Sequence, residues 1–147
     1  MTTALASPTI QIPRSHADLL TRPICGVLTT MGHDGQPRSS LVWVDYDGEC
    51  ACVNTSLQRH KGRDLLADPR TSLLVVDPTD TSRFMQIRGD AELTTEGALG
   101  HLDLLTRKYT RHDHFYGGVY PVEQQARETR VICRIHARRI TLDAIHA

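Results

Sequence analysis

Short apolar runs joined by tight-turn signals are the feature that most constrains the fold of this chain. Six runs are rich in β-branched and aliphatic residues, and short polar turns join most of them. Asp34-Gly35 follows the first run and Asp47-Gly48 the second, and Asp-Gly is typical of a β-hairpin. Gly89 indicates a bulge within the fifth run. The runs are residues 24–30, 38–46, 50–56, 71–77, 83–93 and 129–142.

Helical patterns are inserted between these runs. "SHADLLTRP" predicts a short helix with Ser15 as its N-cap, and residues 58–68 predict a basic helix that ends at Asp68-Pro69. Residues 94–109 predict another helix, with Thr95 as its N-cap. Antiparallel hairpins with few long crossovers predict a mainly β fold, a closed or split barrel. The chain has no Gly-rich fingerprint of a doubly wound sheet.

The length of 147 residues fits one domain, which we assign to residues 13–147, preceded by a flexible arm at residues 1–12. A hydrophobic fraction of 39% is low for a self-sufficient globule and is consistent with an obligate dimer. The formal net charge of zero argues against a dedicated nucleic-acid or membrane-surface protein. No run approaches the roughly 18 apolar residues of a membrane span, and the N-terminus lacks signal-peptide features. We therefore expect a cytoplasmic protein.

The cysteines are expected to be thiols rather than disulfides or metal ligands. Cys25, Cys50, Cys52 and Cys133 fall in apolar strand-like runs, where a reduced cysteine behaves as a small hydrophobe. Cys50 and Cys52 share one face of a strand, but paired zinc ligands are normally two to four residues apart. The His-x-His of "RHDHFYGG" has no evident third ligand and is expected to form a loop beside a pocket or an interface. We expect no metal site.

A cluster of cations at the start of the basic helix requires an explanation. Arg59, Lys61 and Arg63 lie where the helix dipole already carries about half a positive charge. Backbone N–H groups at a helix start favour anions, and added Arg and Lys side chains would suit a phosphate. The alternative is a solvated charged face that Asp64 and Asp68 partly neutralise.

Donor-bearing side chains in the second and third runs lie near this cluster in the sequence. They are Arg38, Ser39, Ser40, Asn54, Thr55 and Ser56. Trp43, the sole tryptophan, is expected either to pack in the core or a dimer interface, or to offer a flat surface to a cofactor. No G-x-S-x-G nucleophile motif is present.

Three stretches together carry a family resemblance. They are "GVLTTMGHDGQPRSSLVWVDYDG", "VNTSLQRHKGRDLLADPRTSLLVVDP" and "QIRGDAEL". Over roughly residues 15–142 the chain resembles the pyridoxamine 5′-phosphate oxidase-like, FMN-binding split-barrel family. It is most similar to the branch of oxidoreductases that depend on coenzyme F420, a deazaflavin.

The resemblance implies a six-stranded antiparallel split barrel that forms a homodimer with two cofactor sites at the subunit interface. Arg59 and Lys61 would hold the cofactor phosphate, and Tyr109, Tyr116 or Tyr120 would close the site. The other cofactor-binding residues that it implies are Arg38, Ser39, Ser40, Val42, Trp43, Asn54, Thr55, Ser56 and Arg63.

The implied function is an oxidoreductase that transfers a hydride between coenzyme F420, or FMN as second choice, and a small organic acceptor. No catalytic side chain is assigned. The alternative is a dimer that binds FMN or another planar anion without turnover. Asp64 departs from the Asn that relatives often carry, and it is expected to weaken anion binding unless it pairs with Arg63 or Arg70. "RIHARRITL" is only a superficial echo of vitamin B6 oxidases.

Overall fold

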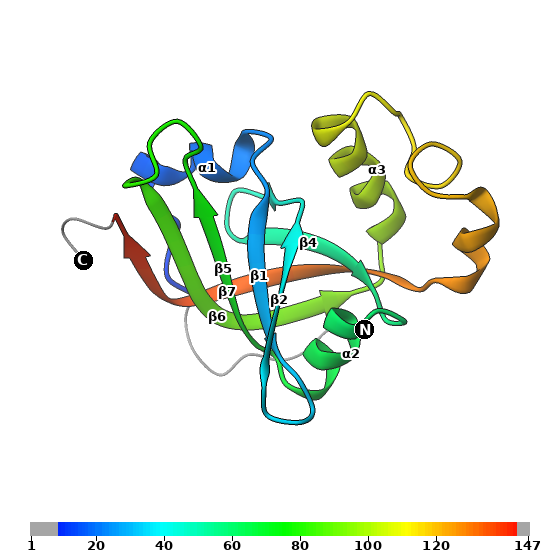
Figure 1. Cartoon of the computed structure of the whole chain (residues 1–147), viewed down its shortest axis with the longest axis horizontal. Coiled ribbons are helices and arrows are strands. Elements are labelled where there is room, and N and C mark those ends of the chain that lie inside the picture. Colours follow the sequence, from blue (N-terminus) through cyan, green and yellow to red (C-terminus); the bar gives the residue numbers. More distant parts are fainter. Residues whose placement is uncertain (1–8, 144–147) are drawn as a thin grey trace.

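One antiparallel sheet forms the centre of the molecule. In the computed structural model, which describes residues 9–143, the sheet has seven strands in the order β2-β1-β5-β6-β7-β4-β3 and curls into a half-barrel (Figure 1). Every neighbouring pair of strands is antiparallel. The strands are β1 (Gly26–Met31), β2 (Pro37–Val42), β3 (Asp45–Tyr46), β4 (Ala51–Ser56), β5 (Arg70–Val76), β6 (Phe84–Thr94) and β7 (Arg130–Leu142).

The mainly β prediction is confirmed, but the predicted count of six strands is wrong. The run at 38–46 leaves the β2 ladder after Val42, so it cannot continue as one strand. Asp45 and Tyr46 instead pair with Cys52 and Ala51 as a separate strand. The interruption places Trp43 outside the ladder, beside the cavity described below.

Alternation along the strands separates a buried face from a more open one. In β6 every second side chain is buried, as the expected period of two requires. The predicted bulge is confirmed, because the β6–β7 register shifts between Arg88 and Gly89. The largest fully buried side chains of the barrel include Leu28, Leu73, Ile87 and Ile135.

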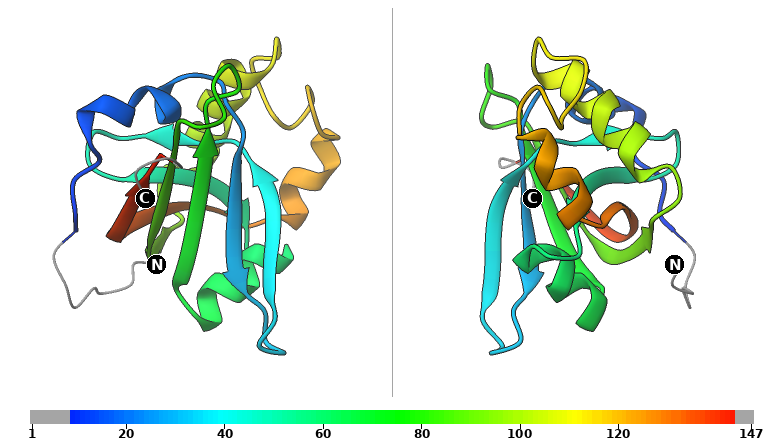
Figure 2. Two further views of the ribbon diagram at one scale, coloured as in Figure 1. Left: turned by 60° about the vertical axis from the view of Figure 1, so that its left-hand side comes forward. Right: turned by 90° about the vertical axis from the view of Figure 1, so that its right-hand side faces the viewer.

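Short helices lie at the ends and side of the barrel. They are η1 (Arg14–His16), α1 (Asp18–Thr21), α2 (His60–Ala67), α3 (Ala98–Tyr109) and η2 (Val122–Arg127). The helix predicted near Ser15 is thus split into a 3₁₀ turn and one α turn. The basic helix ends before Pro69, as predicted. Figure 2 shows α3 and η2 together on one side of the barrel, with α2 below them.

The start of α3 differs from the prediction of Thr95 as N-cap. Gly97 precedes the helix in the left-handed region at φ 74°, and its carbonyl accepts the first helical hydrogen bond from His101 N at 3.0 Å. Glycine adopts this conformation without strain, so the chain turns here rather than two residues earlier.

The flexible arm predicted at residues 1–12 lies mostly outside the described residues. In its described part, Ile10 N donates to Ala137 O at 2.8 Å and Ile12 is buried in the core, so this part packs onto the barrel.

All four cysteines are free thiols, as the sequence predicts. Within residues 9–143, no helix is long and apolar enough to cross a membrane.

Candidate functional site

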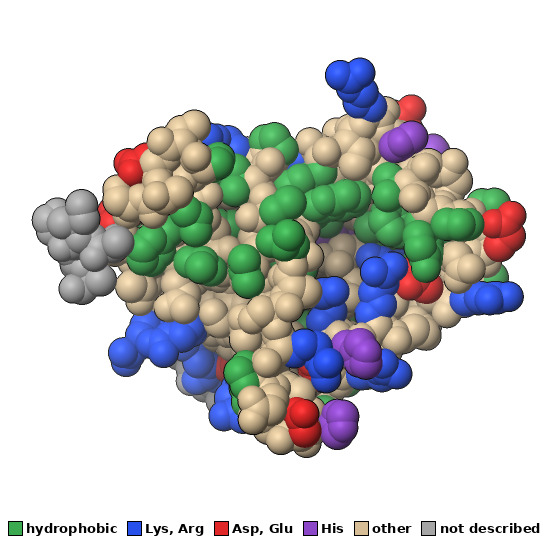
Figure 3. Space-filling model, in the orientation of Figure 1, with side chains coloured by type: hydrophobic (Ala, Val, Ile, Leu, Met, Phe, Trp, Pro, Cys, Tyr) green, Lys and Arg blue, Asp and Glu red, His purple; other side chains and the backbone are tan. Residues whose placement is uncertain are grey.

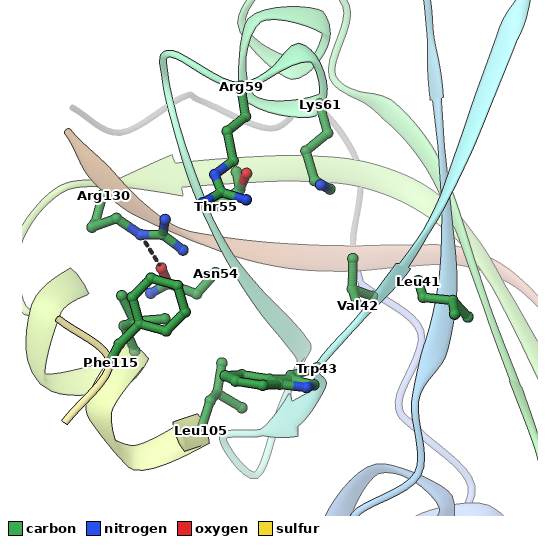
Figure 4. Close-up of a pocket in the computed structure, with 11 residues that line it drawn as sticks. Leu41, Val42, Trp43, Asn54, Thr55, Arg59, Lys61, Leu105, Phe115 and Arg130 are labelled. Atoms are coloured by element: carbon green, nitrogen blue, oxygen red, sulfur yellow. Dashed lines mark hydrogen bonds between the residues drawn. The ribbon is translucent and has the colours of Figure 1, made fainter. Parts of the chain in front are cut away.

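A cavity of about 160 Å³ opens where β2, β4, α2 and α3 meet (Figure 4). Cationic side chains gather at one end of it, and aromatic and aliphatic side chains line the other. The lining residues are Leu41, Val42, Trp43, Asn54, Thr55, Arg59, Lys61, Leu102, Leu105, Phe115 and Arg130.

The cationic end is formed by Arg59, Lys61 and Arg130. Arg59 Nε donates to Glu128 at 3.2 Å, and Arg130 Nε donates to Asn54 Oδ1 at 2.9 Å. Burial, together with the charges of Arg59 and Arg130, lowers the pKa of Lys61. Among the described residues, the Lys61 ammonium has no hydrogen-bond or ion-pair partner. Like charges held together in this way favour an anion between them.

Glu128 organises these cations. Its carboxylate accepts hydrogen bonds from Tyr116 Oη at 2.6 Å, Arg59 Nε at 3.2 Å and Arg130 Nη1 at 3.4 Å. Burial opposes ionisation of Glu128, but these partners outweigh it and lower the pKa of the carboxyl. The ionised carboxylate therefore holds both guanidinium groups beside the cavity.

Thr55 adds an unsatisfied donor to this end. Its Oγ1 is buried and has no hydrogen-bond partner among the described residues. A buried hydroxyl without a partner costs about 1–3 kcal/mol. Such a group in a cavity wall, beside cations, is suited to bind an anionic oxygen.

A second hollow of about 400 Å³ adjoins the cationic end. It shares Arg59 and Lys61 with the first cavity, so these two side chains stand between the spaces. Figure 3 shows Lys and Arg side chains around a hollow beside an apolar patch. The other lining residues are Arg38, Ser39, Ser40, Gln58, His60 and Arg63.

Asp64 pairs with neither of the arginines proposed for it. Its buried carboxylate accepts hydrogen bonds from Thr30 Oγ1 at 2.8 Å and Arg38 Nε at 3.0 Å. Arg63 instead contacts His60, and Arg70 pairs with Asp68. Asp64 therefore neutralises Arg38, the cation contributed by β2, and Lys61 has no ion-pair partner within residues 9–143.

The aromatic end is built around Trp43. Tyr109 stacks against it at a centroid distance of 5.5 Å and an interplanar angle of 11°, and Phe115 meets it edge-on at 6.2 Å. Tyr109 Oη donates to Ile24 O at 2.7 Å and accepts from Val44 N at 3.0 Å, which anchors the stack to the barrel.

The three tyrosines expected to close the site therefore occupy different positions. Tyr109 supports Trp43, whereas Tyr116 contacts Glu128 at the cationic end. The Tyr120 ring lies 5.7 Å from the Arg59 guanidinium carbon.

The structure brings most of the sequence-predicted site residues together. Six of them line the cavity, namely Val42, Trp43, Asn54, Thr55, Arg59 and Lys61. Four line the adjoining hollow, namely Arg38, Ser39, Ser40 and Arg63. Ser56 lines neither, because it is fully buried and its Oγ donates to Glu128.

Phe115 lies in the segment that was expected to form a loop beside a pocket, and it lines the cavity. Sequence reasoning missed Glu128 and Arg130. They come from the long segment after α3 and from the start of β7. β4–β7 pairing sets Arg130 opposite Ser56, across 74 positions of sequence. The only local signal was an arginine at the beginning of an otherwise apolar strand.

Comparisons with known proteins agree with this architecture. The chain aligns with an F420 reductase at a TM-score of 0.73 and 26% identity, over 88% of this chain and 98% of that one. A conserved hypothetical protein from Mycobacterium tuberculosis gives 0.70 and 28%, over 96% and 89%. A heme-binding protein from Mycobacterium smegmatis gives 0.58 and 21%, over 90% and 55%, a likeness of fold alone. The family model described as pyridoxamine 5′-phosphate oxidase matches residues 12–142, so the chain belongs to that family.

Proposed function

We propose that this protein is an oxidoreductase that binds a phosphorylated deazaflavin, coenzyme F420, or FMN as second choice, and reduces a small organic acceptor. One observation carries the proposal. Lys61 and Thr55, whose donors have no partner among the described residues, share a cavity with Trp43 and Phe115. The same cavity therefore offers donors suited to a phosphate group and aromatic side chains suited to a flat ring. The likeness to an F420 reductase supports it.

The residues present fit such a cofactor. Arg59 and Lys61 would bind its phosphate, with the Thr55 hydroxyl as a further donor. Trp43 and Phe115 would hold the ring and exclude water from it. The cofactor supplies the hydride chemistry, and the protein supplies binding and orientation.

The second hollow favours the deazaflavin over FMN. FMN ends at its phosphate, whereas the deazaflavin carries an acidic tail beyond it. Arg59 and Lys61 separate the ring-binding cavity from the hollow, which Arg38 and Arg63 also line. Asp64 neutralises Arg38, so a tail that leaves the phosphate in that direction would meet the positive charge of Arg63.

The apolar patch beside the site supports a homodimer. Leu41 is 73% exposed and also lines the cavity. The strand register sets Leu41 beside Val27 and Val27 beside Leu74, which makes a continuous apolar row across β2, β1 and β5 (Figure 3). A second copy on this row would cover it and complete the wall of the cavity. Sedimentation equilibrium tests this, and a strictly monomeric protein would contradict it.

Turnover separates an enzyme from a binding protein. Reduced coenzyme F420 is mixed with the protein and a panel of conjugated small acceptors, and reoxidation is followed by absorbance. We expect acceptor-dependent reoxidation, and at a cofactor concentration near the wild-type dissociation constant it should slow when Lys61 is replaced by alanine. Tight binding without reoxidation across the panel would favour the non-catalytic alternative.

Thr55→Val tests the unpartnered hydroxyl with two measurements. The free protein should unfold with an unchanged or slightly higher free energy, because a buried donor without a partner is removed. Cofactor affinity should fall about threefold to tenfold, the value of a hydrogen bond of about 1 kcal/mol. Calorimetric titration and urea unfolding measure the two effects.

Thr71→Val is the matched control. Its Oγ1 donates to Thr29 O at 2.8 Å, and Thr71 lines neither the cavity nor the adjoining hollow. This change should therefore lower stability by about 1 kcal/mol and leave cofactor affinity unchanged. Equal cofactor affinity in Thr55→Val and wild type would show that the hydroxyl does not face the ligand.

Asp64→Asn tests whether Asp64 moderates the positive charge of the hollow. The amide oxygen can still accept from Thr30 and Arg38, so the fold should persist. Removal of one negative charge should raise the affinity for an acidic cofactor about threefold to tenfold, because the repulsion between Asp64 and the anion is worth roughly 1 kcal/mol. Asp68→Asn, at the far end of α2, should change affinity little. An unchanged or weaker affinity in Asp64→Asn would refute this role.

A further inference from the structure

A second group of chemically reactive side chains lies away from the cavity, at the other end of β4. Cys50 immediately precedes β4, and His136 lies on the neighbouring strand β7. Cys50 Sγ is 3.7 Å from His136 Nδ1, although the two residues are 86 positions apart in the sequence. The Glu49 carboxylate lies within 4.8 Å of both ligand atoms.

The hydrogen bonds of His136 determine which ring nitrogen carries a lone pair. His136 Nε2 lies 2.8 Å from the Glu92 carboxylate, an acceptor, so Nε2 carries the proton of the neutral ring. Nδ1 therefore presents a lone pair, which faces the Thr9 hydroxyl at 2.7 Å and Cys50 Sγ. A carboxylate on the distal nitrogen is the usual partner of a metal-binding histidine, because it fixes the ring and raises its basicity.

Local charge and backbone geometry also suit a cation. Asp47, Glu49 and Glu92 surround Arg134, which contacts all three, so the carboxylates outnumber the guanidinium. Asp47 Oδ1 accepts from Glu49 N at 2.9 Å and from Cys50 N at 2.7 Å. These two bonds fix the turn that presents Glu49 and Cys50.

We propose that Cys50 Sγ, His136 Nδ1 and the Glu49 carboxylate form a binding site for a thiophilic divalent cation of the zinc class. Zinc–sulfur and zinc–nitrogen bonds of about 2.3 and 2.0 Å at a tetrahedral angle set S and N about 3.5 Å apart. The Cys50–His136 separation of 3.7 Å matches this. The ion takes the Nδ1 lone pair from Thr9, and water or that hydroxyl completes the shell.

The identity of the ion follows from the donors. A buried thiol, an imidazole and one carboxylate suit zinc rather than magnesium or calcium, which prefer oxygen ligands. The ion binds the thiolate of Cys50, so binding releases the thiol proton to water. Glu49 is exposed and offers the ion a path from solvent.

Cobalt titration of the full chain tests the site. Cobalt(II) should bind at one equivalent and produce a thiolate-to-cobalt charge-transfer band, which zinc then abolishes. Cys50→Ser and His136→Gln should lose the band. Cys25→Ala, which removes the exposed thiol, should keep it. A band that is absent in wild type, or that persists in Cys50→Ser, would overturn the proposal.

Glu49→Gln keeps the test informative if the buried variants fail to fold. Glu49 is exposed, so its replacement should leave the fold intact and weaken zinc binding about tenfold to a hundredfold. Zinc should also raise the thermal midpoint of wild type more than that of Glu49→Gln. Identical zinc affinities in the two proteins would contradict the assigned ligand set.

Discussion

Lys61→Ala is expected to weaken cofactor binding by about one to two orders of magnitude. Lys61 is half-buried between Arg59 and Arg130, and no described residue pairs with its ammonium. A bound phosphate would give the Lys61 ammonium a charge-assisted hydrogen bond, which contributes roughly 1.5–3 kcal/mol to the binding free energy. Isothermal titration of wild type and variant with coenzyme F420 measures the loss.

A charge-matched control separates this contact from a general loss of positive charge. Arg70→Ala removes one cation from an exposed position, where Arg70 pairs with Asp68. Its cofactor affinity should stay within about threefold of wild type, because exposed ion pairs contribute little. If both variants lost affinity equally, long-range charge rather than a phosphate contact would explain the result.

Gly62→Ala is expected to destabilise the fold by about 3 kcal/mol or more, the upper range for an overpacked site. A Cβ at Gly62 would lie 2.0 Å from Ser56 O and 2.8 Å from Ser56 C. These are backbone atoms, so α2 and the end of β4 must separate. Urea unfolding followed by circular dichroism measures the loss.

Gly100→Ala is the opposite case within α3. Among the described residues, no heavy atom beyond its chain neighbours and the backbone of its own helix lies within 4 Å of its Cβ position. Alanine is the better helix former, so stability should rise by about 0.5–1 kcal/mol. Similar changes in the two variants would refute the close packing of α2 on β4. That packing also positions Thr55 relative to Lys61, so Gly62→Ala should weaken cofactor binding as well.

Local chemistry explains which parts of the fold the sequence could predict. Asp34-Gly35 and Asp68-Pro69 favour a turn and a helix end by their own backbone preferences, and the structure has both at these places. Gly89 has no side chain and allows the close backbone contact of the β6–β7 bulge. The break after Val42 depends on pairing with Cys52 and Ala51, so alternation along one strand could not reveal it.

In the candidate site, too, neighbouring residues could be predicted from the sequence, whereas residues brought in by strand pairing could not. Thr55, Arg59 and Lys61 lie within seven positions of one another, and the hydroxyl and charge pattern was visible locally. Arg130 and Glu128 join them only through the pairing of β4 with β7. The ion-pair partner of Asp64 could also not be predicted from the sequence, because Asp64 lies on α2 and its partner Arg38 lies on β2.

The most direct test of the proposed function is a fluorescence titration of the purified protein with coenzyme F420 and, in parallel, with FMN. Trp43 is the sole tryptophan and lines the proposed ring site, so a bound ring should quench its emission. We expect saturable quenching by both ligands, with tighter binding of the deazaflavin. If neither ligand gave saturable quenching, the proposed cofactor site would be wrong.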